Sequence, residues 1–374
     1  MSRAVRESGA PGPYPRAELM SRLLVIKTGA LGDVLRTTSI LPGLAERSPA
    51  LELTWVTATG AGPLLAGHPH VAEVIEVDPR SPEALGHLEA SLGGQAFDRV
   101  LSLDDEEPLC RLASALAERT GATPTGAVLG PDGQPAYTDD AACWFGMGLL
   151  CREGLAEADR RKLANRRTHA ELLAEVVGVR PDRPHLELEV GERAAGASRA
   201  EALAGPGPGP LIGLNTGAGG RWATKAMRVE EVARLAALLA SSSIVAPRLV
   251  LLGGPDEVER NGDLAARIRA AAPGVSLAEA PLDLELREFA ALVGTLDLLV
   301  TSDSLALHMG VAQARRVVAF FAPTSPHEID LFGRGEKVVS TAPDAGSYRR
   351  DADNGSITAE RVAAAVQRQL AEPR

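Results

Sequence analysis

Short aliphatic runs alternate with helical stretches along most of the chain, and this alternation limits the possible folds more than any other feature. In the first half, the sequence predicts buried strands over residues 22–27, 51–58, 71–78 and 97–104. Helices are predicted between and after them, over residues 33–47, 62–69, 82–91 and 160–178. Strands and helices that alternate in this way form a parallel sheet covered on both faces. The first half is therefore predicted to be a Rossmann-like α/β domain.

The same pattern begins again after residues 191–210, a stretch that ends in AGPGPGP and suits neither a helix nor a strand. We therefore predict a disordered leader (1–20), an N-terminal domain (21–190), a linker (191–210), a C-terminal domain (211–345) and a final segment (346–374). The helix expected near the end of that segment is predicted to pack back on the N-terminal domain. Ligands of parallel sheets bind beyond the carboxyl ends of the strands, so two facing sheets predict a site in the cleft between them.

Composition excludes several classes of function. A formal net charge of -10 argues against broad nucleic-acid binding, which needs an excess of Lys and Arg. No apolar run approaches the roughly 18 to 20 residues that span a bilayer, and residues 1–20 lack the apolar centre of a secretory signal. Cys110, Cys143 and Cys151 form no metal-binding or disulfide pattern, so we expect a cytoplasmic protein.

The loop TGALGD, residues 28–33, joins the first predicted strand to the first helix. It is neither a dinucleotide fingerprint nor a P-loop, since Lys27 stands where the first glycine of GxGxxG would be and no GK[ST] follows. Gly29 and Gly32 let the backbone turn tightly and leave space beside Asp33. Two interpretations of Asp33 remain open at this point. It stabilises the helix dipole, or it is a general base on a rigid mount.

Two later loops carry polar groups at predicted strand ends. NTGAGGRWATK, residues 215–225, combines bare amides with Arg221 and Lys225, which is either a phosphate cradle or a solvated surface loop. In VTSDSLALHMG, residues 300–310, Asp303 is placed to cap a helix that contains His308. His308 is by default a packed core residue, and the alternative is that Ser304 and this helix N-terminus face a diphosphate.

Two acidic stretches give no metal site. Residues 104–107, DDEE, fit no metal-ligand spacing and are interpreted as a solvated turn. Asp351 and Asp353 spell DxD but lie in a polar loop with no predicted strand before it. The sequence therefore implies neither a metal nor another cofactor.

The ordered segments KTGALGDVLRTTSILPGL, NTGAGGRWATK, LVLLGGPDE and DSLALHMGVAQARRVVAFFAPTSP resemble the heptosyltransferases of glycosyltransferase family 9, over residues 22 to 370. The resemblance implies the two-domain GT-B fold, in which the N-terminal half binds the acceptor and the C-terminal half an activated sugar, usually ADP-heptose. It implies transfer with inversion and without a catalytic metal. Asp33 matches the presumed base of the family, and Gly29 and Gly32 fall on the acceptor side. The implied donor-binding residues are Thr216, Gly217, Lys225, Gly253, Gly254, Asp303, Ser304 and His308.

The sequence departs from the family pattern at three places. Leu305 stands where a glycine is expected after Asp-Ser, residues 225–228 read KAMR instead of Lys-Arg-Trp-Pro, and the paired C-terminal cysteines are missing. Leu305 motivates an alternative, a noncatalytic nucleotide-sugar binder, and an epimerase of the same fold is a third hypothesis. The expected partners are a nucleotide-sugar donor and a lipid-linked glycan. A basic cluster, Arg160, Arg161, Lys162, Arg166 and Arg167, either meets phosphates at the inner membrane surface or is a solvated helix face.

Overall fold

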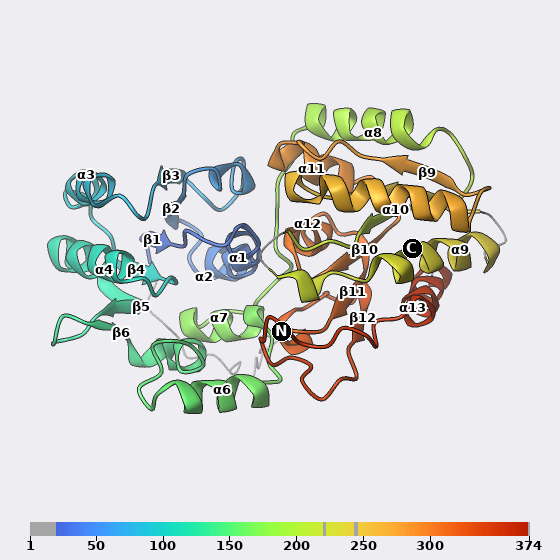
Figure 1. Cartoon of the computed structure of the whole chain (residues 1–374). Helices are drawn as coiled ribbons and strands as arrows, with labels where there is room; N and C mark the ends of the chain where they lie inside the picture. The colour runs from blue at the N-terminus through green and yellow to red at the C-terminus, as the bar shows by residue number, and fades with distance from the viewer. Residues whose placement is uncertain (1–19, 220–221, 243–245, 373–374) are drawn as a thin grey trace, which may run out of the picture.

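Two six-stranded sheets form the centres of two lobes in the computed structural model, which describes residues 20–219, 222–242 and 246–372 (Figure 1). The first sheet has the strand order β3-β2-β1-β4-β5-β6 and is parallel except for the β5–β6 pair. Its strands are β1 (Arg22–Ile26), β2 (Glu52–Ala58), β3 (Glu73–Val77), β4 (Arg99–Ser102), β5 (Thr123–Leu129) and β6 (Pro135–Tyr137). The predicted strands of this half are present, whereas β5 and β6 were not predicted.

The helices of the N-terminal lobe are α1 (Leu31–Thr37), α2 (Leu41–Arg47), α3 (Pro82–Leu92), α4 (Glu107–Thr120), α5 (Ala142–Phe145), α6 (Leu155–Ala164) and α7 (His169–Val177). The helix predicted over 33–47 is interrupted by a 3-10 turn (Thr38–Ile40). The one predicted over 160–178 is two helices, because Thr168 caps α7 by accepting a hydrogen bond from the amide of Glu171. The stretch at 62–69 forms only a 3-10 turn (Gly62–Leu64).

The second sheet repeats the topology with the order β12-β11-β10-β7-β8-β9, all parallel. Its strands are β7 (Leu211–Asn215), β8 (Arg248–Leu251), β9 (Ser276–Glu279), β10 (Leu298–Ser302), β11 (Arg316–Phe321) and β12 (Gly335–Val339). The helices are α8 (Val190–Ala204), α9 (Val229–Ser242), α10 (Val258–Ala271), α11 (Leu286–Val293), α12 (Leu305–Ala312) and α13 (Ala359–Ala371). The predicted α/β class, with two facing Rossmann-like units and parallel sheets, is confirmed.

Two predictions about the connecting segments are wrong. Most of the predicted linker, residues 191–210, is helix α8, which packs so closely on α11 that a Cβ on Gly196 would lie 2.6 Å from the carbonyl oxygen of Ala291. Only the Gly- and Pro-containing end of the stretch, after Ala204, is irregular. The final helix, α13, does not pack on the N-terminal lobe. It lies beside α9 and against β11 and β12, where Val362 and Val366 join the core of the C-terminal lobe (Figure 1).

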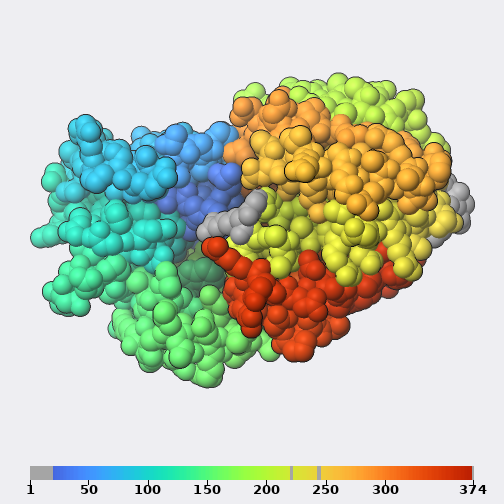
Figure 2. Space-filling view, in the orientation of Figure 1, coloured from blue at the N-terminus to red at the C-terminus, as the bar shows by residue number. Residues whose placement is uncertain are grey.

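The predicted leader lies outside the described residues except for Met20, which is buried in the core of the N-terminal lobe and so does not belong to a disordered leader. The two lobes share an apolar cluster that contains Leu35 and Leu64 from the first and Ala306 and Met309 from the second. In Figure 2 the lobes meet where blue atoms touch orange atoms and where green atoms touch red atoms. Helix α1, which follows the carboxyl end of β1, packs against helix α12 of the opposite lobe.

Candidate active site

The loop after β1 is anchored by a buried carboxylate from the neighbouring strand. Asp104 lies two residues after the end of β4, and its carboxylate forms an ion pair with the ammonium group of Lys27. The hydroxyl of Thr28 donates a hydrogen bond of 2.8 Å to Asp104 Oδ2. Interpreting residues 104–107 as a solvated turn is therefore wrong for Asp104, because the parallel strands bring it against the first loop. The same contacts fix the loop that presents Asp33.

Asp33 lies in the first turn of α1 with its side chain 36% exposed. Its Oδ2 accepts a hydrogen bond of 3.2 Å from the amide of Ala30, and its Oδ1 lies 2.9 Å from Nη2 of Arg36. Burial raises the pKa of Asp33, but the positive charges of Arg36 and Lys27 outweigh burial and hold the pKa below its ordinary value. Asp33 is therefore ionised at neutral pH and accessible to a ligand.

The first turn of α1 touches α12 of the other lobe at Gly32. A Cβ at this position would lie 2.5 Å from Cδ2 of His308, so the close approach requires glycine. Burial, and then the positive charge of Arg36, lowers the pKa of His308 to about 4, even though Asp303 and Asp33 act in the opposite direction. His308 is therefore neutral and lies at the contact between the lobes. It is buried, as predicted for a core residue, and its part in donor binding stays a prediction.

Lys225 reaches the end of β10 rather than open solvent. Its Nζ lies 3.0 Å from both the backbone oxygen and Oδ2 of Asp303, and 5.7 Å from the centre of the Trp222 ring. Ser304, not Asp303, is the N-cap residue of α12, so the capping interpretation of Asp303 is wrong. The side-chain amide Nδ2 of Asn215, at the end of β7, donates a hydrogen bond of 3.2 Å to the Ser304 hydroxyl. The two predicted donor loops thus converge.

The glycine-rich loops after β7 and β8 are joined by a carboxylate that was not predicted as a site residue. Glu257 accepts hydrogen bonds from the amides of Gly219, at 2.8 Å, and Gly254, at 2.6 Å. A Cβ on Gly217 would lie 2.3 Å from Oε1 of Glu257, and one on Gly253 would lie 3.1 Å from Oε2. These glycines therefore leave room for a side-chain carboxylate.

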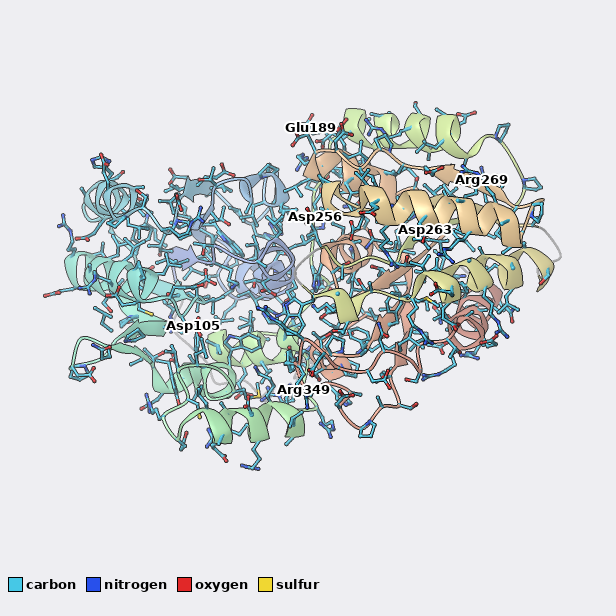
Figure 3. The ribbon with its side chains drawn as sticks, in the orientation of Figure 1. Asp105, Glu189, Asp256, Asp263, Arg269 and Arg349 are labelled. Carbon is cyan, nitrogen blue, oxygen red and sulfur yellow. The ribbon has the colours of Figure 1, made fainter. Side chains whose placement is uncertain are left out.

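The remaining residues singled out in the sequence lie in different places. Thr216 is buried, and its backbone oxygen accepts a hydrogen bond of 3.2 Å from Arg260. A Cβ on Gly29 would contact no described atom within 4 Å, which agrees with open space in this loop. Arg221 lies outside the described residues. Asp351 forms an ion pair of 2.8 Å with Arg349, which Figure 3 labels on the C-terminal lobe.

A small pocket of about 30 Å³ opens beside Asp33 on the N-terminal lobe. Arg36, Trp144 and His169 line it together with Lys27 and Asp33. None of the first three was predicted as a site residue, because they come from α1, α5 and α7 and only the fold brings them together. Arg36 could have been suspected from its position three residues after Asp33 on one helix face.

The predicted basic cluster is mostly paired with acidic side chains. Arg160 and Arg161 form ion pairs of 2.6 Å and 2.8 Å with Glu157, and Arg167 forms one of 2.6 Å with Glu175. Lys162 instead lies over the ring of Tyr348, 4.6 Å from its centre. This last contact bridges the lobes, since green α6 meets the red C-terminal segment in Figure 2.

The sequence profile of glycosyltransferase family 9 (heptosyltransferase) matches residues 86–353, well over half of the chain. The chain belongs to glycosyltransferase family 9. The predicted family and the predicted enzyme class, a glycosyltransferase, are therefore confirmed. A family 9 glycosyltransferase from Veillonella parvula has a similar fold, with a TM-score of 0.73, 21% identity and coverage of 94% of this chain and 98% of that one.

Two further proteins are similar to this family 9 glycosyltransferase. The ADP-heptose lipopolysaccharide heptosyltransferase II of E. coli superposes with a TM-score of 0.65 at 20% identity, covering 93% of this chain and 98% of that one. Lipopolysaccharide heptosyltransferase 1 of Pseudomonas aeruginosa is 41% identical, but only over 56 residues, which are 15% of this chain and 16% of that protein.

Two features are not found among the described residues. No helix there is both long enough and apolar enough to cross a membrane. That part of the chain also contains no group of three or more His, Cys, Asp or Glu side chains placed to hold a metal ion.

Proposed function

We propose that this glycosyltransferase transfers heptose from an ADP-activated donor to a lipopolysaccharide core or a related surface glycan. The observation that carries the proposal is the pairing of two loops across the lobe boundary. An ionised, accessible Asp33 lies on one side, and Lys225, Asp303 and the N-terminus of α12 lie on the other. Helices α1 and α12 pack closely at Gly32 and His308, which brings the two sides together. The choice of heptose as the sugar and of a lipid-linked acceptor rests on the names of the similar proteins, which are lipopolysaccharide heptosyltransferases.

In the proposed reaction, Asp33 takes the proton from an acceptor hydroxyl while that oxygen attacks the anomeric carbon from the face opposite the leaving group. The bond from the anomeric carbon to the diphosphate breaks, and the configuration inverts. Arg36 keeps the Asp33 carboxylate ionised, which makes it a weak base that acts only as the attacking oxygen becomes acidic. The acid–base step therefore needs no group other than Asp33.

Lys225 is proposed to stabilise the diphosphate as it leaves. The phosphate oxygens would compete with Asp303 for the Lys225 ammonium group, and the free amides at the start of α12 would donate to the same oxygens. Gly217, Gly253 and Gly254 would line the donor side, with Thr216 beneath them. Charge stabilisation by a lysine and a helix N-terminus can replace a divalent cation, so we propose a metal-independent reaction.

Leu305 stands where the family has a glycine beside the expected diphosphate site, so its side chain could affect both donor binding and transfer. Its side chain is partly buried and packs against the apolar cluster shared by the lobes, and we propose that it leaves the α12 amides accessible to a diphosphate. We therefore propose that the family activity is retained. A protein of this kind would work in the cytoplasm, with peripheral contact to the inner membrane where its acceptor is found.

Melting curves with ADP-, GDP- and UDP-sugars test the donor, because a ligand that binds only the folded state raises the melting temperature. Transfer to deacylated lipopolysaccharide core saccharides, with and without EDTA, tests the reaction and its independence of a metal ion.

Lys225→Met is expected to lower kcat about 10² to 10³-fold, because it removes the positive charge proposed to stabilise the leaving diphosphate. Arg269→Met, which removes an ion pair to Glu279 on the outer surface of the same lobe, is the matched control.

Three outcomes decide between the proposed activity and its alternatives. ADP-heptose binding with transfer supports the proposal. Binding without transfer to any saccharide indicates a noncatalytic nucleotide-sugar binder, and release of an altered sugar without an acceptor indicates an epimerase.

A further inference from the structure

Two of the side chains that line the pocket beside Asp33 each have a buried polar atom that lacks a hydrogen-bond partner anywhere in the described part of the chain. These atoms are Nε of Arg36 and Nδ1 of His169. Arg36 uses Nη2 for its ion pair with Asp33, which leaves its Nε–H without an acceptor. A buried polar atom without a partner costs about 1 to 3 kcal/mol, so a pair of them at one pocket points to a group that enters and satisfies both.

The charges around the pocket favour an uncharged group. Lys27 is paired with Asp104, and Arg36 is paired with Asp33, so the cations that line the pocket are already balanced. Burial, and then the charges of Arg36 and Lys27, keeps the pKa of His169 well below its ordinary value, so the imidazole is neutral. A phosphate or carboxylate would bring an uncompensated charge into this balanced site, whereas a hydroxyl would not.

The donor and acceptor character of the two atoms also matches a hydroxyl. Arg36 Nε–H can only donate, and Nδ1 of a neutral His169 accepts when the ring proton is on Nε2, which is the tautomer that we assign to the bound form. One hydroxyl accepts the first hydrogen bond and donates the second. The volume of about 30 Å³ exceeds the roughly 10 to 15 Å³ that one water needs, and so leaves room for the carbon that bears the hydroxyl. Trp144 adds an aromatic wall and meets the His169 ring edge to face, with ring centres 4.9 Å apart.

We propose that this pocket binds a second hydroxyl of the acceptor sugar, next to the hydroxyl that attacks. Arg36 Nε donates to this second hydroxyl, and the hydroxyl donates to His169 Nδ1. Because Asp33 lines the same small pocket, the two hydroxyls must be close neighbours on one sugar ring. The acceptor is therefore a sugar with adjacent free hydroxyls, and His169 is a positioning residue. The inference rests on the proposed transferase function but concerns the acceptor alone.

His169→Phe tests the proposal, because it keeps an aromatic ring against Trp144 and removes the ring nitrogen. The matched control is His68→Phe, the same change at another buried histidine of this lobe that does not line the pocket. Calorimetry without donor measures binding of deacylated lipopolysaccharide core saccharides. We expect His169→Phe to weaken saccharide binding at least tenfold and to leave ADP binding and the melting temperature close to those of His68→Phe. A merely structural role would move all three quantities together.

Nitrogen NMR of the histidine rings gives a second readout on the unmodified protein, in which the saccharide should move the Nδ1 resonance of His169. The proposal is overturned if no saccharide of the panel binds, if His169→Phe binds as tightly as the wild type, or if a high-resolution complex shows only a water between Arg36 Nε and His169 Nδ1. If His169→Phe does not fold, the test uses the wild-type protein and a deoxy saccharide in which hydrogen stands in place of the neighbouring hydroxyl. The proposal is overturned if the wild type binds this deoxy saccharide as tightly as the parent saccharide.

The two levels of the account fail separately. Saccharide binding that depends on His169, without transfer from any ADP-sugar, leaves the pocket in place and removes the proposed transferase. Transfer by His169→Phe with an unchanged KM for the saccharide supports the proposed transferase and removes the proposed role of the pocket.

Discussion

Gly32→Ala is expected to separate the two lobes at the point where the proposed site is assembled. The new methyl carbon would lie 2.5 Å from Cδ2 and 3.1 Å from Nε2 of His308. Optimal carbon–carbon contacts are about 3.5 to 4.0 Å, so the overlap is about 1 Å. His308 is buried and cannot rotate freely into solvent. Overpacking of this kind typically costs about 1 to 3 kcal/mol, and we expect the free energy of unfolding to fall by that amount.

Urea denaturation of four proteins measures this effect as a double-mutant cycle: wild type, Gly32→Ala, His308→Ala and the double variant. Removing the imidazole makes room for the methyl group, so the two changes should be non-additive by at least about 1 kcal/mol. Gly86→Ala is the control, because a Cβ there meets no described atom within 4 Å and the residue lies in helix α3. The reasoning is refuted if Gly32→Ala costs less than about 0.5 kcal/mol, or if its cost is the same with and without the His308 ring.

Two further predictions concern stability. Asp104→Asn leaves the buried Lys27 ammonium group without its carboxylate and should cost about 3 to 5 kcal/mol, measured by urea denaturation. Asp105→Asn, one residue along and labelled in Figure 3, is the control and should change stability by less than about 0.5 kcal/mol. His308 has a folded-state pKa of about 4 against 6.5 in the unfolded chain, so the unfolded state binds its proton first as the pH falls. Its contribution, about 3 kcal/mol at 1.36 kcal/mol per unit, is therefore present above pH 6.5 and lost between pH 6.5 and 4. His308→Gln should reduce the loss of stability over that range, to which the buried His169 also contributes, whereas replacing the exposed His87 by Gln should leave the loss unchanged. An equal loss in both variants contradicts the assignment.

The sequence predicted the parts of the fold that depend on local pattern. Strand β1, its glycine-containing loop and the start of α1 follow from an aliphatic run with a turn signal after it. That pattern made Asp33 one candidate for a base, and the family resemblance then selected it. Helix α8 was missed because the linker predicted from the Gly and Pro residues after Ala204 was drawn too long. It included the preceding segment, which contains good helix formers. Helix α13 was predicted, but an amphipathic pattern does not say which lobe receives its apolar face.

The parts of the site that could not be predicted depend on contacts between distant residues. Asp104 looked like one member of an acidic turn, and only the β1–β4 pairing places it under Lys27. His169 and Arg36 share a pocket because α7 packs on α1, which no local signal indicates. Glu257 could have been suspected, since it follows the second pair of glycines at the start of a helical stretch, where a carboxylate can accept from backbone amides.

The most direct test of the central claim is transfer by Asp33→Asn in a single turnover with saturating ADP-heptose and a saccharide that the wild type accepts. The change keeps the size of the side chain and removes the proton acceptor. We expect the rate to fall at least about 10²-fold, with ADP binding and the melting temperature unchanged. A variant that transfers heptose within about threefold of the wild-type rate would show that residue 33 is not the base.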